Sequence, residues 1–155
     1  MPISSANISW NGETVLMNNN ATYWGGALYA IWYSNVFETG HSIFRNNSAY
    51  AAGGVVIYGY SVSFSHGTTL FEESTVGGKG AALDVHVRSN ASWTGGTTFN
   101  DNTANRAGAI FVWKLDVSWT GNTTFVDTVA NLVGGAVYTT VNIQIHCSGH
   151  KDIPQ

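Results

Sequence analysis

A Gly-rich step followed by a short apolar segment recurs five times along this 155-residue chain, at intervals of 26 to 28 residues. The five copies are Gly25–Leu28, Gly53–Val56, Lys79–Ala82, Ala107–Ile110 and Gly134–Val137. A fixed period of this length is typical of solenoids, in which each repeat packs only on its neighbours. The period therefore predicts a stack of about five similar units.

The residues between the Gly steps favour strands over helices. Val, Ile, Thr, Tyr, Phe and Trp dominate the segments, and clusters of Gly or Asn separate them. The 18 Gly would be costly in helices. We therefore expect an all-β fold, a right-handed, single-stranded parallel β-helix of about five coils, with 26–28 residues and three short strands per coil. The repeats span residues 1–146, and residues 147–155 form a C-terminal tail or the start of a further segment.

Three columns of large apolar residues are predicted to fill the interior, because like residues of successive coils stack about 4.8 Å apart. The first is Trp10, Phe37, Phe64, Trp93 and Trp119, the second is Leu16, Phe44, Phe71, Phe99 and Phe125, and the third is Tyr29, Ile57, Leu83, Phe111 and Tyr138.

Smaller residues form further columns. A ladder that supports the turns is predicted at Asn19, Asn47, Ser74, Asn102 and Thr128, because stacked Asn side chains satisfy turn amides and one another. Thr14, Ser42, Thr69, Thr97 and Thr123 share the parity of the Phe column and should point inside rather than form a flat exposed Thr face. The position after Ala in the Gly step holds Leu28, Val56, Ala82, Ile110 and Val137. Strict alternation turns this position outward, so it either forms an exposed apolar stripe or is rotated inside by a bulge.

The composition excludes several classes of function. Only 10% of the residues are charged and the net charge is −3, which argues against nucleic acid and against a polybasic membrane-surface role. No stretch is long enough to span a bilayer, and no cofactor or nucleotide motif occurs. His146, Cys147 and His150 lack the further ligands of a zinc site. We expect no metal, no cofactor and no catalytic residue.

Five Asn-X-Ser/Thr sequons occur, at Asn7, Asn20, Asn46, Asn90 and Asn122. They are candidate N-glycosylation sites and predict an extracellular or cell-surface glycoprotein. The N-terminus lacks the basic and apolar regions of a signal peptide, so a segment of a longer secreted chain would reconcile the two observations.

Two motifs alternate along the repeats. Phe44-Arg45-Asn46-Asn47 and Phe99-Asn100-Asp101-Asn102 have the pattern F-x-x-N, and Gly25–Leu28 and Gly134–Val137 have the pattern G-G-A-(I/L/V). This pairing resembles the repeats of the chlamydial polymorphic outer membrane proteins and of related microbial surface proteins, from about residue 7 to 145. The resemblance implies a pectate-lyase-like β-helix that serves as a surface-exposed adhesin. It departs at Leu16, at Ser74 and Thr128, and at the third Gly step.

One group of residues could form a ligand or partner face. Asp84, His86 and Arg88 alternate along one strand and are expected to point outward, with Tyr58 and Tyr60 beside Asp84 and His86 on one neighbouring coil. Lys114 and Asp116 lie on the other neighbour, and Trp32 lies one coil beyond Tyr60. Charged groups flanked by exposed aromatic rings suit a saccharide, although two Asp are too few for a Ca²⁺-dependent lyase.

The sequence therefore predicts a non-enzymatic structural or adhesive module, either part of a longer chain or self-assembling into a filament. Its partners would be neighbouring coils, copies of itself, glycans or a cell-surface partner. The alternative is a carbohydrate-active β-helix, polysaccharide-binding or lyase-like, that uses the face around Asp84, His86 and Arg88.

Overall fold

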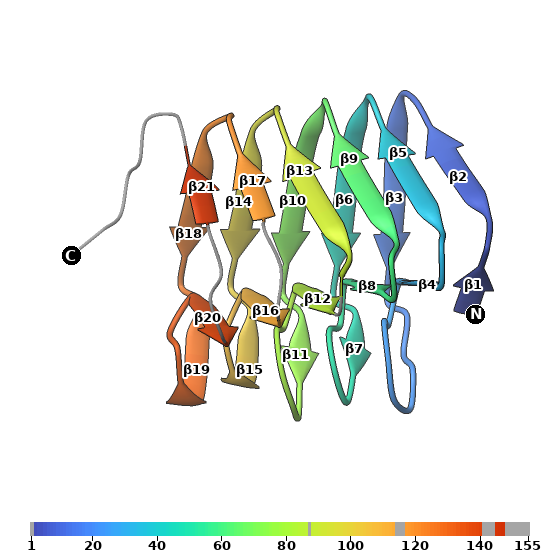
Figure 1. Ribbon diagram of the computed structural model, residues 1–155. Coiled ribbons are helices and arrows are strands. Elements are labelled where there is room, and N and C mark those ends of the chain that lie inside the picture. Colours follow the sequence, from blue (N-terminus) through green and yellow to red (C-terminus); the bar gives the residue numbers. More distant parts are fainter. Residues whose placement is uncertain (1, 87, 114–116, 141–144, 148–155) are drawn as a thin grey trace.

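A computed structural model describes residues 2–86, 88–113, 117–140 and 145–147, with strands and no helix among them. The side chains of residues 2–4, 62, 64 and 145–147 lie outside this description. Each coil pairs with the next through parallel strands in continuous register, which builds a β-solenoid of about five turns (Figure 1). The predicted all-β parallel solenoid is confirmed.

Four sheets run along the solenoid, and each coil contributes one strand to most of them. Sheet A contains β1 (Pro2–Ser4), β4 (Leu28–Ile31), β8 (Val55–Tyr58), β12 (Leu83–His86), β16 (Ile110–Trp113) and β20 (Val137–Thr140). Sheet B contains β2 (Asn7–Trp10), β5 (Asn35–Glu38), β9 (Val62–Ser65), β13 (Asn90–Trp93), β17 (Val117–Trp119) and β21 (Ile145–Cys147). Sheet C contains β3 (Glu13–Met17), β6 (His41–Arg45), β10 (Thr68–Glu72), β14 (Thr97–Asn100) and β18 (Thr123–Val126). Sheet D contains β7 (Ser48–Ala49), β11 (Thr75–Val76), β15 (Thr103–Arg106) and β19 (Val129–Val133).

Sheet D is a fourth sheet, in addition to the three strands per coil that the sequence predicts. After each strand of sheet C the chain turns outward at the Asn ladder and returns to the next strand of sheet A. The five excursions, residues 18–27, 46–54, 73–82, 101–109 and 127–136, project from the stack as a row of arms (Figure 1). Val76, Ala81 and Ala104 form a separate small apolar cluster inside the arms. The arms therefore pack on each other as well as on the coil.

The Phe column is confirmed in full. Leu16, Phe44, Phe71, Phe99 and Phe125 are register partners on successive strands of sheet C. Phe99 is completely buried, and its ring stacks on Phe71 at 5.1 Å and on Phe125 at 5.0 Å. This column forms the centre of the main hydrophobic core, together with the inward side chains of sheets A and B.

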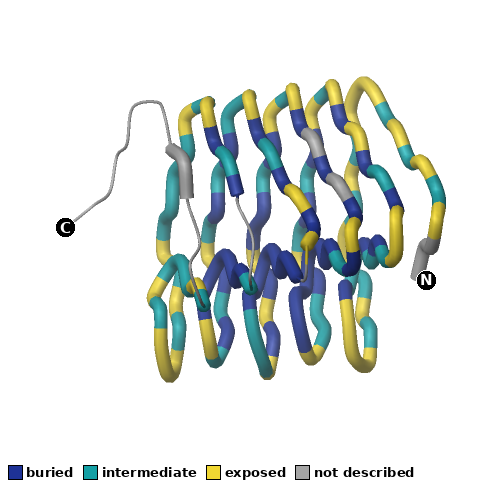
Figure 2. The backbone as a smooth tube through the Cα atoms, in the orientation of Figure 1, coloured by how far each residue is buried: buried dark blue, intermediate teal, exposed yellow. Residues whose placement is uncertain are grey.

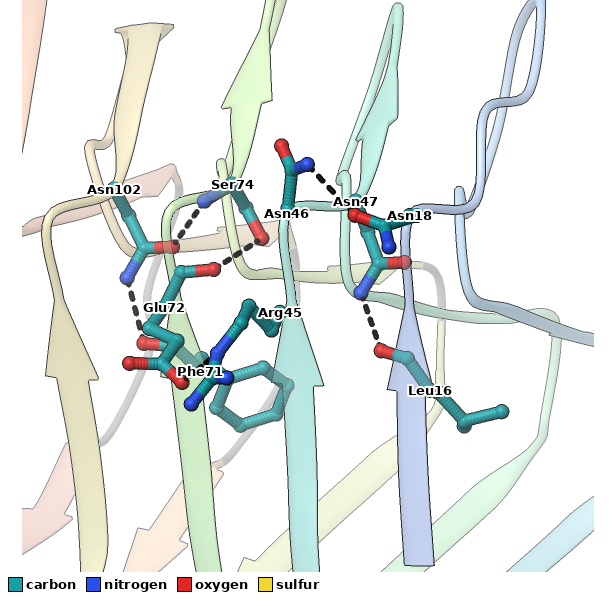
Figure 3. Close-up of polar contacts among 9 residues, drawn as sticks. All are labelled: Leu16, Asn18, Arg45, Asn46, Asn47, Phe71, Glu72, Ser74 and Asn102. Atoms are coloured by element: carbon teal, nitrogen blue, oxygen red, sulfur yellow. Dashed lines mark hydrogen bonds and ion pairs between the residues drawn. The ribbon is translucent and has the colours of Figure 1, made fainter.

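The Asn ladder is confirmed at its first four positions. The side chain of Asn47 accepts hydrogen bonds from the backbone and the amide of Asn19, and its own amide donates to the carbonyl of Leu16. Asn102 repeats this arrangement, since it accepts from the backbone of Ser74 and donates to the carbonyl of Phe71 (Figure 3). Both Asn are fully buried, so these bonds satisfy polar groups at the turn from sheet C into the arms.

The first predicted column is wrong at two of its five positions. Trp10, Glu38, Ser65, Trp93 and Trp119 are the actual register partners in sheet B. Phe37 lies on the outward face and is 38% exposed, and Phe64 is its register partner. The reason is the number of residues between this position and the next Gly along the chain. These Gly residues lie directly on one another in successive coils and so set the register. The Trp residues precede this Gly by two positions and the Phe residues by three, which reverses the side chain's face.

The third predicted column combined the two faces of sheet A. Its true inward column is Leu28, Val55, Leu83, Ile110 and Val137, whereas Tyr29, Val56, Asp84, Phe111 and Tyr138 share the opposite face. In the structure the Gly steps align at residues 25, 52, 80, 107 and 134, all of which have positive φ. The alignment predicted from the sequence is therefore one residue out of register at Gly53 and at Lys79. Ala52 and Ala107 adopt this left-handed conformation with φ of 49° and 54°, and their Cβ atoms conceal the alignment in the sequence.

The two other columns of small or apolar residues are mostly inside. Ser42, Thr69 and Thr97 are buried, as predicted from their parity. The position after Ala forms no exposed stripe, because Leu28, Val56, Ala82 and Ile110 are buried and Val137 is partly buried. Sheet A lies between the stack and the row of arms, and its central strands are mostly dark in Figure 2. Both faces of the central part of this sheet are therefore covered.

Candidate functional site

The predicted face around Asp84, His86 and Arg88 is not a solvated surface. Asp84 is 0% and His86 is 3% exposed, whereas Arg88, two residues further on, is exposed. The side chains of Asp84 and His86 do point away from the main core, as expected. They are buried because the arms cover this face of sheet A, a feature that the sequence pattern did not predict.

The predicted neighbours are shifted by two residues. Tyr58 is the register partner of His86, and Val56 is the partner of Asp84. Tyr60 instead contacts Arg88, whose Nη1 donates a hydrogen bond of 2.6 Å to the Tyr60 hydroxyl. Lys114 and Asp116 lie outside the described residues. The predicted face therefore separates into a buried pair on β12 and an exposed corner beyond it.

The buried pair consists of Asp84 and His86, which lie two residues apart on the same face of β12. Nε2 of His86 is 2.6 Å from Oδ1 of Asp84, although the contact lacks the alignment of a hydrogen bond. Burial raises the pKa of Asp84. The close approach of the His86 ring nitrogen and the charges of His86 and Lys79 partly lower this pKa again. Removal of one partner would leave the polar atoms of the other buried without a partner, which typically costs about 1–3 kcal/mol.

Aromatic rings enclose the pair. The His86 ring contacts those of Trp24, Tyr58, Phe111 and Trp113, with centroid distances of 5.5 to 6.0 Å. Lys79 in the third arm places Nζ 4.8 Å from the centroid of Phe111 and 4.7 Å from that of Trp113. Together they leave Asp84 and His86 almost without exposed surface, so a ligand at the surface does not reach the pair directly.

A hollow crosses the arms on the outer side of Trp24 and Lys79. Trp24 and Tyr50 supply aromatic rings from the first two arms, and Gly77 and Gly78 of the third arm leave space because they have no side chains. Lys79 and Arg106 are backbone bridge partners on neighbouring arms and place two cations beside this space. None of the lining residues is acidic. The local charge of the hollow is therefore positive, in a chain whose net charge is −3.

The exposed corner between sheets A and B has a strained backbone. Trp32, Tyr33, Tyr60 and Arg88 all have positive φ, between 44° and 60°. The rings of Tyr33 and Tyr60 stack at 5.3 Å, and Trp32 packs edge-on against Tyr58. Left-handed bulky residues cost about 1–3 kcal/mol each, and such strain often occurs at functional positions. The corner therefore presents aromatic side chains where Gly or Asn would be more stable.

All five sequon asparagines are exposed: Asn7, Asn20, Asn46, Asn90 and Asn122. Within the described ranges no group of three or more His, Cys, Asp or Glu side chains could hold a metal ion. The same part of the chain contains no helix that could cross a membrane. The structure thus places every candidate glycosylation site at the surface, and occupancy of these sites stays a prediction.

Sequence reasoning missed three residues near these sites. Trp24, Lys79 and Arg106 belong to the arms, which were treated as turns. A fourth residue is Glu38, because the sequence pattern favours Phe37 and not Glu38 as the inward residue of β5. The two-residue spacing of Trp10 from Gly12 and of Trp93 from Gly95 was the signal that could have revealed Glu38. No comparable signal exists for the contact of the first arm with β12, because Trp24 and His86 are not equivalent positions of the repeat.

Comparisons with protein-family models, with curated proteins and with solved structures each find no match to this chain. The resemblance to the polymorphic outer membrane protein repeats therefore stays an expectation based on the two motifs.

Proposed function

We propose that this chain is a non-enzymatic β-solenoid module with a structural or adhesive role outside the cell, within a longer chain or a self-assembling glycoprotein. The observation that carries this proposal is β19, the edge strand of sheet D. Its residues Val129, Leu132 and Val133 are 49%, 68% and 43% exposed. An exposed apolar edge strand without Pro or charge offers unpaired backbone to another strand.

Other features of the surface support the same role. The Asp–His pair is enclosed, and the exposed aromatic corner at Trp32, Tyr33 and Tyr60 has a composition typical of protein-interface hot spots. The extracellular location rests on the five exposed sequons. Neighbouring coils of a longer chain or a second copy would cover β19 by the parallel pairing that joins β15 to β19 within the molecule.

Light scattering over a range of protein concentrations tests the self-assembly. We expect the chain to form end-to-end oligomers whose mass rises with concentration. Leu132→Lys should shift the population towards the monomer, because a charge on an edge strand opposes strand pairing. Thr75→Lys is the matched control, since Thr75 is exposed on β11, which belongs to the same sheet and is paired on both sides by β7 and β15. A wild-type chain that stays monomeric throughout would contradict self-assembly.

A carbohydrate-binding role is the second candidate, and the hollow favours it. Trp24 and Tyr50 offer ring faces, and Lys79 and Arg106 offer donors for an acidic group. The hollow thus suits a ligand that binds through rings and charge.

Titration with an acidic oligosaccharide and a neutral one, followed by NMR, tests this role. We expect the acidic sugar alone to shift the arm resonances, and Arg106→Gln to weaken its binding about tenfold or more. Arg88→Gln is the control, because Arg88 is exposed at the other corner. Equal binding of both sugars, or none, would remove this candidate, and release of cleaved product during the titration would contradict the non-enzymatic proposal.

A further inference from the structure

Two exposed tyrosines lie against each other at the corner between sheets A and B. The rings of Tyr33 and Tyr60 have centroids 5.3 Å apart and planes that are 11° from parallel. Tyr33 is 65% and Tyr60 is 39% exposed. In the part of the chain that the structure describes, the other aromatic contacts of tyrosines are with Trp, Phe or His. The fold thus holds two phenol rings together at the surface.

The backbone directs the two tyrosines to the same side. Tyr33 follows β4 and Tyr60 follows β8, in each case by two residues, and both have a φ of 60°. The next residues, Ser34 and Ser61, are fully buried. Each serine hydroxyl donates a hydrogen bond, of 2.7 and 2.8 Å respectively, to the last carbonyl of the preceding strand. A strained φ persists only where the surrounding structure enforces it, and here the same turn enforces it in both coils.

Arg88 restrains the second ring from the next coil. Its Nη1 donates a hydrogen bond of 2.6 Å to the hydroxyl of Tyr60, and its guanidinium carbon lies 5.5 Å from the centroid of the same ring. A guanidinium at this distance is attracted to the ring face. Arg88 therefore keeps Tyr60 beside Tyr33 while both phenols stay accessible to solvent.

We propose that Tyr33 and Tyr60 are a site of oxidative cross-linking, at which a haem peroxidase with hydrogen peroxide joins the second and third coils through a dityrosine bond. The oxidant removes one electron and one proton from each phenol. The two radicals then couple through a carbon–carbon bond between one Cε atom of each ring, and the hydrogen atoms of these carbons move to the phenol oxygens. Each hydrogen peroxide becomes two water molecules, and the chain loses two hydrogen atoms.

Coupling within one molecule is favoured because the fold keeps the two rings at short range. Groups held in this way react at an effective concentration far above that of the dissolved protein. The rings need only turn from a stacked to an edge-to-edge arrangement, and exposed side chains change rotamer within nanoseconds. The site is independent of the proposed structural role, because the reaction requires only the two phenols and the oxidant.

Tyr23 and Tyr50 provide an internal comparison. They lie on the first two arms, directly before the backbone bridge partners Trp24 and Ala51, and are 68% and 63% exposed. Neither ring forms an aromatic contact with the other, although both belong to the described residues. They are therefore as accessible as the proposed pair but lack its ring contact.

Treatment of the dilute full chain with a haem peroxidase and hydrogen peroxide, followed by mass spectrometry, tests the proposal. We expect the monomer to lose two hydrogen atoms, to gain dityrosine fluorescence and to yield peptides joined at Tyr33 and Tyr60. The unfolding midpoint should rise by about 5–10 °C, because a cross-link restricts the unfolded chain as a disulfide does. Tyr33→Phe and Tyr60→Phe should each abolish this product, and Tyr50→Phe should retain it.

Three results would overturn the proposal: an unchanged mass, cross-links between molecules only, or a loss of two hydrogen atoms that persists in Tyr33→Phe. Coupling of Tyr23 with Tyr50 in place of the proposed pair would do the same. Oxidation of Met or Trp adds oxygen and raises the mass, so it is not confused with the cross-link. Phenylalanine retains the ring at each position, so the variants keep the stacking contact and should fold.

Discussion

Replacement of Phe99 by alanine should lower the free energy of unfolding by about 3–5 kcal/mol. Phe99 is completely buried at the centre of the confirmed column, and its ring stacks on Phe71 and Phe125 on either side. The substitution therefore removes the burial of one ring and both stacking contacts, and the sheets cannot collapse into the space because coil spacing is fixed by backbone pairing. Chemical denaturation followed by circular dichroism measures the loss.

Phe37→Ala is the matched control for this prediction. Phe37 is the same residue type but is 38% exposed on the outward face of sheet B, so its loss should be clearly smaller. Equal losses of unfolding free energy in the two variants would contradict the register of sheet B. In that register the position two residues before the stacked Gly faces inward, and the position three residues before it faces outward.

Gly67→Ala should prevent the chain from folding cooperatively. Gly67 stacks between Gly40 and Gly95 at the corner between sheets B and C, and a Cβ at Gly67 would lie 1.6 Å from the carbonyl oxygen of Gly40. That atom belongs to the backbone and accepts the hydrogen bond from Thr68, so it cannot move without loss of pairing between the coils. The expected loss exceeds about 4 kcal/mol, a large part of the 5–15 kcal/mol that stabilises a typical domain.

Gly135→Ala provides the control for Gly67→Ala. No atom lies within 4 Å of a Cβ placed at Gly135, so this variant should retain nearly the stability of the wild type. Circular dichroism and the dispersion of NMR resonances distinguish a folded chain from an unfolded one. A Gly67→Ala variant that folds with native stability would show that the close approach of successive Gly residues is not required.

The candidate sites were predictable only in part. The sequence indicated that Asp84 and His86 share a face, because residues two apart on a strand point the same way. It did not indicate that this face is buried, since the ring of Trp24, which covers His86, belongs to the first arm and lies far from β12 in the sequence. Glu38 was inferable from its distance to Gly40, and the hollow was not, because its lining residues come from all five arms.

The sequence by itself determined the repeat, the parallel strands, the Phe column and most of the Asn ladder. These features depend on residues that recur at one period, and stacking of like on like follows directly from it. Only the tertiary structure decided which face of sheet A is covered, where Glu38 lies and how the arms create a positively charged hollow. Those properties arise from contacts between non-equivalent positions of different coils, and their geometry depends on one-residue shifts within the repeat that a periodic pattern does not reveal.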